Sequence, residues 1–427
     1  MKKWRNWART VECSPEGLLF PKSIEEVQAL VKEASKLGKK IRVVGAGHSF
    51  TKLVQTNSWL VSLDSLSGIE EMDEKNRTVT VLGGTRLFQI AKELGEGGWS
   101  QENLGDINVQ SIAGAISTGT HGTGLQFGNL SSQVEEFTFV TASGELLTVS
   151  KADKYFSAAV VSLGSLGIIV RVTLRIIKCP VYEYKSTKVP FHDLIPELER
   201  YIESNRHFEM YLFPYSDLVQ VKTMNITSNK PHSLTRHQLG SLILENYTFF
   251  LLSELCRWFP KLTRFVSRLS AKAVSTTSIS AYSYQLFATP RKVKFSEMEY
   301  CIPLEYMRAA IEEVHETIKK NGYEVHFPIE CRTVKGDDIW LSPSYQRDSA
   351  YIAFHMYKGM PHEEYFRDME AIMKKYDGRP HWGKMHKRKS DELEQLYPMF
   401  SEYLKVRQEL DPEGMFLNEY LEEIFGI

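Results

Sequence analysis

The spacing of apolar residues near the start of the chain predicts a helix and two short strands. Apolar residues at positions 27, 30, 31, 34 and 37 share one helical face, and residues 23–26 have the S-x-x-E form of a capping box. Residues 39–44, which end in Val43 and Val44, and the apolar run 59–63 each indicate a short strand. The first run leads directly into Gly45-Ala46-Gly47, so we expect strand, glycine loop and strand to pack closely.

The alternation of strands and helices continues to about residue 178. Residues 77–82 predict a strand, and Thr85 is placed to cap a helix over residues 87–94 that a cluster of glycines ends. Two apolar runs within residues 134–147 are separated by a Ser-Gly pair, which predicts a hairpin. Residues 167–177 are rich in β-branched side chains, which favours a further strand.

The second half of the chain predicts another mixed set of elements. After a polar passage bracketed by Pro180 and Pro190, the pattern predicts strands and then long helices at residues 208–213, 218–223, 304–321 and 361–376. At 427 residues the chain exceeds the usual size of a single core. We therefore predict an α+β fold with two domains, residues 1–178 and residues 179–427.

Composition and charge narrow the kind of partner. The chain carries 52 basic and 53 acidic residues, so its net charge of -1 provides no field to attract nucleic acid. A small-molecule partner is expected instead. The five cysteines are scattered, without a C-x-x-C pair or zinc-like spacing, which indicates a reducing, cytoplasmic location and no structural metal.

One apolar stretch, from Leu242 to Phe265, raises the question of a membrane. It contains five charged residues, whereas a spanning helix needs about 20 mostly uncharged ones. A partly buried helix, or a helix that lies on a membrane surface, is the preferred interpretation. The N-terminus lacks the apolar run of a secretory signal.

Two glycine-containing stretches in the first domain suggest a ligand site. In Arg42-Val-Val-Gly45-Ala-Gly47-His48-Ser49-Phe50, consecutive amides can form an anion-binding nest, although taken alone a structural turn is favoured. The stretch from Leu104 to Gly124 contains five glycines and several serines and threonines. A buried glycine corner does not explain so many hydroxyl groups, so this stretch could hold a flat heterocycle and phosphates.

At these two stretches the chain resembles flavoproteins of the vanillyl-alcohol oxidase type, which have a glycine loop followed by a G-T-H-G-T-G segment. Residues 164–169 and the start of the chain are also similar to that family. The resemblance implies an FAD cofactor that is covalently attached through His48. The FAD-binding residues that it implies are Val44, Gly45, Ala46, Gly47, His48, Ser49, Phe50, Gly105, Asp106, Gln110, Ser111, Gly114, Ser117, Thr118, Gly119, His121, Gly122, Thr123, Gly124, Ile169, His381 and Lys384.

Motifs in the C-terminal half resemble the aldonolactone oxidase branch of that family, similar to gulonolactone oxidase and to alditol oxidase. The motifs lie at residues 326–332, 336–349, 378–384 and 411–418, and the similarity covers most of the chain except about residues 225–290. The resemblance implies that residues 179–427 form a substrate (cap) domain. It also implies that a final segment, about residues 378–427, returns to the flavin site.

Glu330 and Arg332 are candidate substrate-binding residues. They are two positions apart, so in an extended segment both side chains point to the same side. A carboxylate can bind substrate hydroxyls, and a guanidinium can bind an oxygen that gains negative charge when its proton leaves. Without the resemblance, a solvated ion pair is favoured. The resemblance implies a substrate-binding role for both residues and for Lys384, and it places Ser111 near substrate and flavin.

Lys384 and His355 each have a functional and a structural interpretation. Lys384 follows His381-Trp382-Gly383 and could stabilise an alkoxide, but taken alone it reads as a solvated charge. His355 occupies a position where alditol oxidase has a small hydroxyl residue. Its imidazole either narrows the substrate pocket or is a hydrogen-bonded core histidine.

Together these features predict FAD-dependent oxidation of a hydroxyl carbon of a sugar lactone, an aldono-1,4-lactone, with O2 as the acceptor and H2O2 as the second product. The alternatives are an oxidase of alditols such as xylitol or sorbitol, and a lactone dehydrogenase that uses a quinone or cytochrome and touches a membrane. A flavin-binding protein without turnover is disfavoured, because Glu330, Arg332 and Lys384 occur together.

Overall fold

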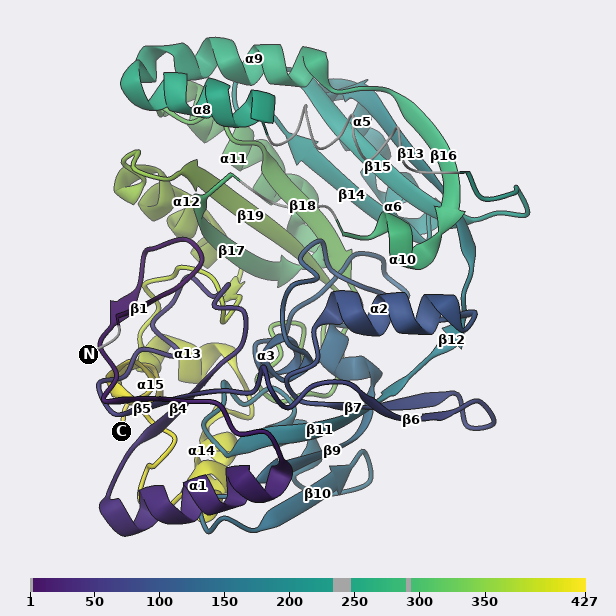
Figure 1. The fold of residues 1–427 in the computed structure, drawn as a ribbon. Helices are drawn as coiled ribbons and strands as arrows, with labels where there is room; N and C mark the ends of the chain where they lie inside the picture. The colour runs from purple at the N-terminus through teal and green to yellow at the C-terminus, as the bar shows by residue number, and fades with distance from the viewer. Residues whose placement is uncertain (1–2, 233–246, 289–292) are drawn as a thin grey trace.

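The computed structural model describes residues 3–232, 247–288 and 293–427. Figure 1 shows two halves, each built of sheets and helices, with both chain ends at the same side of the lower half. The fold class is the predicted α+β. Within the described residues, no helix is both long enough and apolar enough to cross a membrane.

The lower half in Figure 1 contains a three-stranded and a five-stranded sheet. Two short antiparallel pairs accompany them, β1 (Trp4–Arg5) with β2 (Glu12–Cys13) and β8 (Trp99–Ser100) with β12 (Ile177–Lys178). A parallel sheet has the order β3–β5–β4, and an antiparallel sheet has the order β10–β9–β11–β7–β6. Their strands are β3 (Gly17–Leu19), β4 (Ile41–Val44), β5 (Trp59–Ser62), β6 (Ile69–Asp73), β7 (Thr78–Leu82), β9 (Val134–Val140), β10 (Leu146–Ser150) and β11 (Ile168–Arg175). The accompanying helices are α1 (Ile24–Leu37), α2 (Leu87–Glu96) and α3 (Ile112–Ser117).

Helix α1 begins at the predicted capping box. The Ser23 hydroxyl accepts a hydrogen bond from the backbone N–H of Glu26, and Gly38 ends the helix in the left-handed conformation. Val27 and Val31 on its apolar face are fully buried against β-strand residues such as Val61. The helical spacing of apolar residues therefore fixes which side of α1 faces the sheets.

An eight-stranded antiparallel sheet dominates the upper half in Figure 1. Its strand order is β16–β13–β15–β14–β18–β19–β17–β20. The strands are β13 (Val181–Pro190), β14 (His207–Leu212), β15 (Leu218–Ile226), β16 (Thr277–Tyr282), β17 (Phe295–Pro303), β18 (Ile329–Val334), β19 (Ser349–Tyr357) and β20 (Arg379–Pro380). Helices pack on it, among them α6 (Leu198–Ser204), α11 (Met307–Asn321) and α12 (Glu363–Lys375).

Alternate side chains along these strands lie on opposite faces of the sheet. Residues such as Met210, Cys331 and Phe354 are buried in a core with α11 and α12. Their immediate neighbours point to the other face, as the two-residue period of a strand requires. That second face carries a group of charged and polar side chains, which is the reason the sheet matters for function.

The end of the chain returns to the lower half. Helices α13 (Ser390–Leu396), α14 (Phe400–Leu410) and α15 (Glu419–Phe425) lie beside the N-terminal strands in Figure 1. Backbone bonds join the two ends, including Ile41 N–H to the Met415 carbonyl at 2.8 Å and Phe50 N–H to the Gly383 carbonyl at 2.7 Å.

Arg42 on β4 ties these segments together. Its guanidinium is fully buried and donates to the carbonyls of Leu53, Leu163, Gly164 and Phe416. A buried guanidinium is tolerated only when its donors are paired, so these four carbonyls are structural requirements. Arg42 therefore fixes the strand from which the glycine loop starts.

Three sequence predictions need correction. The polar passage between Pro180 and Pro190 is the strand β13, because backbone pairing with both β15 and β16 stabilises it despite its polar side chains. Thr85 does not cap α2; its hydroxyl donates to the Leu82 carbonyl, and Arg86 takes the capping position.

The stretch from Leu242 to Phe265 is not one helix. Its first five residues lie outside the described part of the chain, and the remainder is interrupted. Helix α8 (Phe249–Trp258) ends before Pro260, a short 3-10 turn (Pro260–Leu262) follows, and α9 (Thr263–Ala273) begins the next helix. Proline cannot donate the backbone bond that a continuous helix needs, which explains the break.

Candidate active site

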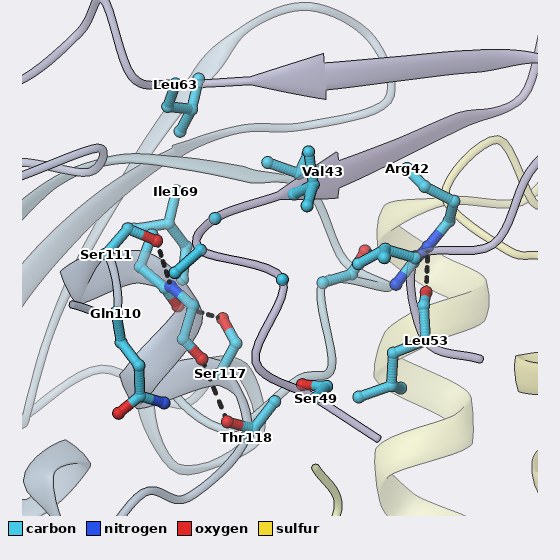
Figure 2. Close-up of a pocket in the computed structure, with 18 of the residues that line it drawn as sticks. Arg42, Val43, Ser49, Leu53, Leu63, Gln110, Ser111, Ser117, Thr118 and Ile169 are labelled. Atoms are coloured by element: carbon cyan, nitrogen blue, oxygen red, sulfur yellow. Dashed lines mark hydrogen bonds between the residues drawn. The ribbon is translucent and has the colours of Figure 1, made fainter. Parts of the chain in front are cut away.

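Two adjoining cavities share the lining residues His48, Ser49, Gln110 and Thr118. The first, of about 110 Å³, is lined by the glycine loop after β4, by α3 with its N-terminal approach, and by the start of β11. Figure 2 shows Gln110, Ser111, Ser117 and Thr118 around this cavity. The second, of about 430 Å³, lies against the polar face of the eight-stranded sheet.

The glycine loop has the geometry of an anion-binding nest. Gly47 adopts a positive φ of 66°, and a Cβ on Gly45 would lie 2.3 Å from Ser111 Oγ, so a larger residue there would displace the Ser111 side chain. Among the described residues, no protein acceptor pairs with the backbone N–H groups of positions 46–49. Consecutive unpaired amides of this kind suit the oxygens of a pyrophosphate.

Gln110 is a second feature that suits a bound ligand. It lines both cavities, and its amide nitrogen donates to Thr120 Oγ1 at 3.0 Å. Its amide oxygen is buried, and within the described residues it has no hydrogen-bond partner. Because an unpaired buried acceptor is costly, a ligand N–H at this point would complete the site. A nest for phosphates and an acceptor for a ring N–H together fit FAD.

The predicted cofactor residues divide into three groups. The first cavity is lined by Val44, Gly45, Ala46, Gly47, His48, Ser49, Gln110, Ser111, Gly114, Ser117, Thr118 and Ile169. The second cavity is lined by Phe50, Gly105, Asp106, His121, His381 and Lys384, and it shares His48, Ser49, Gln110 and Thr118 with the first. Gly119, Gly122, Thr123 and Gly124 line neither cavity.

The last residues of the G-T-H-G-T-G segment have structural contacts instead. The Thr123 hydroxyl donates to the Phe208 carbonyl, and Gly124 N–H donates to the Thr333 carbonyl at 2.7 Å. A Cβ on Gly122 would lie 2.4 Å from the Leu104 carbonyl oxygen. These residues join the cofactor loop to strands β14 and β18.

Four neighbouring strands build the polar face of the second cavity. Glu209 on β14 lies opposite Arg332 on β18, and Glu297 on β17 lies opposite His355 on β19. Glu330 on β18 lines the same cavity, so the i, i+2 pair shares one side of its strand. Residues far apart in sequence therefore meet because they occupy matching positions on adjacent strands.

Arg332 is held by three carboxylates. Its Nε donates to Glu209 at 3.0 Å, and its terminal nitrogen pairs with Asp106 at 2.9 Å and with Glu330. Burial opposes the charge, but these carboxylates outweigh it and raise the pKa of Arg332 well above its usual value. Arg332 is thus a fixed cation on the cavity wall.

Glu209 has a second anchor. Lys222 lies 3.5 Å from its carboxylate and stands over the ring of Tyr211, whose hydroxyl lies 3.3 Å from Glu209. Burial raises the pKa of Tyr211 well above its usual value, and Asp106 and Glu209 raise it further. Tyr211 therefore stays protonated and can act as a donor to these carboxylates.

Lys384 reaches the cavity from the returning C-terminal segment. Its ammonium lies 2.5 Å from Glu297, which also approaches Nε2 of His355 at 3.4 Å. Burial would raise the pKa of Glu297, but Lys384 and His355 lower it to about 2. His355 donates from Nδ1 to the Pro328 carbonyl at 3.1 Å, so it is both hydrogen-bonded and exposed to the cavity.

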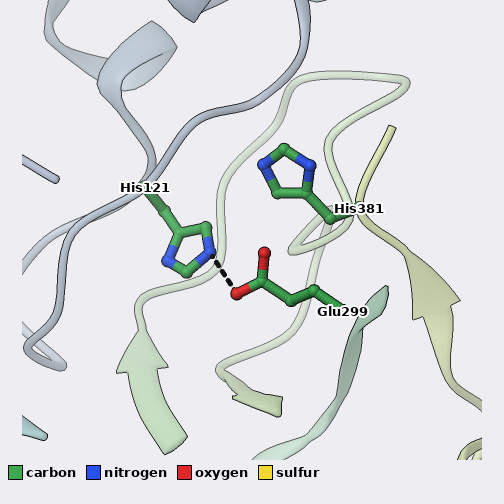
Figure 3. A group of neighbouring side chains, drawn as sticks. All are labelled: His121, Glu299 and His381. Carbon is green, nitrogen blue, oxygen red and sulfur yellow. Dashed lines mark hydrogen bonds and ion pairs between the residues drawn. The ribbon is translucent and has the colours of Figure 1, made fainter. Parts of the chain in front are cut away.

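A second buried group stands beside Lys384. Figure 3 shows His121 and His381 on either side of Glu299, with His121 Nε2 at 3.1 Å from the carboxylate. Their donor atoms lie within 4.8 Å of one another, a spacing that could hold a metal ion. However, Nδ1 of His121 already meets the Gly122 carbonyl, and Nδ1 of His381 accepts from Gly383 N–H. Protein partners therefore engage the group without a metal.

His48 lies where the two cavities meet. Its ring stacks on Trp7 with centroids 5.0 Å apart. Burial, with a smaller effect from Lys384, lowers the pKa of His48 to about 4, so the imidazole is neutral at pH 7.

Glu209, Glu297 and Glu299 are site residues that the sequence reading missed. The signal was present in Phe295–Pro303, where two glutamates at i and i+2 interrupt an apolar run, as Glu330 and Arg332 do in β18. Glu209 stands alone in an apolar strand, and only its pairing opposite Arg332 indicates its importance.

Comparison with known proteins agrees with this site. The family described as D-arabinono-1,4-lactone oxidase matches residues 172–424, and the FAD binding domain family matches residues 15–150. L-gulono-1,4-lactone dehydrogenase of Mycobacterium tuberculosis is 37% identical, over 99% of each chain. L-gulonolactone oxidase of Scyliorhinus torazame is 33% identical, over 99% of this chain and 98% of its own.

A solved structure shows the same fold. Cholesterol oxidase from B. sterolicum superposes with a TM-score of 0.85 over 99% of this chain and 96% of its own, at 18% identity. That likeness concerns the fold, whereas the family matches and the relatives above 30% identity cover nearly the whole chain. The chain therefore belongs to the aldonolactone oxidase family of FAD-dependent oxidoreductases.

Proposed function

We propose that this enzyme oxidises a hydroxyl carbon of an aldono-1,4-lactone and passes the electrons to O2, giving H2O2. The observation that carries the proposal is the grouping of Glu330, Arg332 and Lys384 around a cavity that adjoins the FAD cradle. Relatives named L-gulonolactone oxidase and D-arabinono-1,4-lactone oxidase, the latter from Yarrowia lipolytica, support the substrate class.

The proposed roles of Glu330, Arg332 and Lys384 follow from their charges. Glu330 offers acceptor oxygens for the substrate's hydroxyl groups. Arg332 and Lys384 are fixed cations whose charge stabilises an oxygen that becomes negative when its proton leaves. Bound FAD would supply the acceptor for the hydride from the same carbon. The protein's contribution is to hold these groups without rearrangement during the reaction.

We further propose that FAD is attached through a ring nitrogen of His48. The imidazole lies at the junction of the cavities, and a neutral ring has a nucleophilic nitrogen. Ser111 and His355 are proposed to contact flavin and substrate respectively. We also propose that the FAD-binding domain ends near residue 178 and that residues 378–427 complete its site.

Anaerobic mixing of the enzyme with candidate substrates tests which class of compound it oxidises. Gulonolactone, galactonolactone, arabinonolactone, xylitol and sorbitol would each be added to the oxidised enzyme while the flavin absorbance is followed. The proposal expects bleaching by at least one lactone and slower or no bleaching by the alditols. Bleaching by xylitol or sorbitol alone would reassign the substrate, and no bleaching by any compound would reject the function.

One observation favours a quinone or cytochrome, rather than O2, as the electron acceptor. The relative at 37% identity is named a dehydrogenase rather than an oxidase. Adding O2, a soluble quinone or cytochrome c to the reduced enzyme distinguishes an oxidase from a dehydrogenase. Rapid reoxidation by O2 with stoichiometric peroxide supports the oxidase, whereas reoxidation only by the quinone or cytochrome makes the enzyme a lactone dehydrogenase.

A further inference from the structure

A backbone carbonyl fixes which ring nitrogen of His355 carries the proton. Nδ1 lies 3.1 Å from the carbonyl oxygen of Pro328, and a carbonyl can only accept, so in the neutral ring Nδ1 is the donor. Nε2 is then the acceptor, and the ring lines the second cavity. Phe295 and Phe327 pack against the ring, with centroids 5.1 and 6.4 Å from its own. These contacts hold an acceptor nitrogen at the cavity.

Glu297 is placed to stabilise His355 once the ring has gained a proton. The two residues lie opposite each other on β17 and β19, so the sheet sets their distance. Glu297 Oε1 lies 3.4 Å from Nε2 of His355, slightly beyond the usual range of an N–H···O hydrogen bond. The other carboxylate oxygen, Oε2, pairs with Lys384 at 2.5 Å. A proton on Nε2 would therefore complete an ion pair whose carboxylate is already in position.

The charged side chains of the cavity wall are poorly suited to take a proton. Burial opposes the charges of Arg332 and Lys384, yet neighbouring carboxylates raise the pKa values of both, so they stay protonated. The three carboxylates that hold Arg332 pair with its charge. Burial raises the pKa of Glu297, but Lys384 and His355 lower it to about 2. A carboxylate with so low a pKa is a weak base.

His121 and His381 have no ring nitrogen left to accept a proton from a substrate. Nδ1 of His121 lies 2.9 Å from the Gly122 carbonyl and Nε2 lies 3.1 Å from Glu299, so both nitrogens face acceptors (Figure 3). In His381, Nδ1 accepts from the N–H of Gly383 at 3.0 Å, which leaves the proton of the neutral ring on Nε2. Each of these rings is thus already engaged by the protein.

We propose that His355 is the general base that takes the proton of the substrate hydroxyl. The inference rests on the proposed function, because it requires a hydroxyl carbon that is oxidised. The O–H bond breaks, its proton moves to Nε2, and its electron pair forms the second bond of the new carbonyl. The C–H bond breaks at the same carbon, and its hydrogen leaves as a hydride to bound FAD. Glu297 then stabilises the imidazolium, while Arg332 and Lys384 stabilise the charge that develops on the oxygen.

The pH dependence of flavin reduction tests this role. Glu297 on β17, Glu330 on β18 and Lys384 after β20 are ionisable groups that face the same cavity, so variants must separate His355 from them. Stopped-flow reduction by lactone would be followed without O2 between about pH 5 and 9. The limiting rate of the parent should rise with pH as one group loses its proton, and then level off.

The variant H355Q should lower the limiting rate at least about a hundredfold and remove this ionisation, since general-base catalysis typically contributes that much. E297Q should keep the ionisation but move it to lower pH, because the imidazolium loses its counter-charge. The exposed substitution H192Q is the control and should behave as the parent does. The shift in E297Q supports the base even if H355Q does not fold.

The ring tautomer gives a readout that needs no turnover. In ¹⁵N NMR spectra of the FAD-loaded enzyme at a pH where the ring is neutral, the signals that H355Q removes should belong to an Nδ1–H tautomer. An Nε2–H tautomer would overturn the proposal. So would an H355Q variant that needs more lactone for half-saturation but keeps the limiting rate and pH dependence of the parent. Failure of every lactone to reduce the parent flavin would reject the proposed function together with the base.

Discussion

Glu209 accepts a hydrogen bond from Nε of Arg332 at 3.0 Å, across the β14–β18 pair in which the two residues lie directly opposite. Asp106 and Glu330 use the terminal nitrogen on one side of the same guanidinium. The orientation of the planar fork toward the cavity therefore depends on Glu209. Glu209 is a positioning residue, because it acts on the substrate through Arg332.

The variant Glu209→Gln should slow flavin reduction by lactone by about a hundredfold, since a small misplacement of a catalytic group can cost that much. Glu209→Asp keeps the charge and should recover part of the rate. Stopped-flow reduction over a range of lactone concentrations separates binding from the chemical step. Glu203→Gln, an exposed substitution, is the control. A parent-like rate with Glu209→Gln would show that Arg332 needs no such support.

The second prediction concerns flavin reduction in variants of the cluster of Glu330, Arg332 and Lys384. Arg332→Lys keeps a positive charge but loses the planar fork, and Glu330→Gln keeps the shape but loses the negative charge. Each should reduce the flavin roughly a hundredfold more slowly than the parent, with thermal unfolding little changed. If both variants reduce flavin at the parent rate with unchanged saturation, the residues are not part of the substrate site.

The neutral state of His48 allows a test of the flavin linkage. Acid-precipitated parent enzyme should retain its yellow colour, and flavin fluorescence should follow the protein on a denaturing gel. His48→Ala should release the colour to the supernatant, and Trp7→Phe should retain it, because a ring still stacks on His48. Release of all colour from the parent enzyme would exclude a covalent bond.

Six histidines that are wholly or partly buried predict a loss of stability in mild acid. Burial lowers the pKa values of His48, His207, His315 and His386 to about 4, and those of His326 and His381 to about 3. In the unfolded chain each titrates near 6.5, so between about pH 6.5 and 4 the unfolded state binds more protons. The free energy of unfolding should therefore fall as the pH falls through this window.

The slope of the free energy of unfolding against pH has an upper bound of about 1.4 kcal/mol per pH unit for each histidine. Urea unfolding at several pH values would measure it. His207→Gln should reduce this slope by the equivalent of about one proton. A free energy of unfolding that is constant from pH 7 to 5 would contradict the prediction.

Local patterns in the sequence were sufficient for much of the fold. The capping box and apolar spacing predicted α1, and the Ser-Gly turn predicted the β9–β10 hairpin. Both elements depend on residues close in sequence, so their signals are local. The strand β13 was missed because its stability comes from two partner strands rather than from its own side chains.

The site was predicted only where a motif stood close to the chemistry. The spacing of Glu330 and Arg332 predicted that they share one side of a strand, and the family resemblance supplied their substrate-binding role; both line the second cavity. The partners that fix them lie on other strands: Glu209 is 123 residues from Arg332, and Glu297 is 87 residues from Lys384 (384 minus 297). Such pairs are set by strand order, which a single sequence does not reveal.

The carbonyl of Phe416, which completes the bonds of Arg42, has a consequence for biosynthesis. Strand β4 and its glycine loop leave the ribosome early, but the last acceptor for the buried guanidinium arrives only when translation is almost finished. A chain that stops before residue 416 would bury a cation without its full set of acceptors. The full set of bonds to Arg42 can therefore form only after nearly the whole chain has been synthesised, and a chain truncated before residue 416 should hold the strand that precedes the glycine loop less firmly.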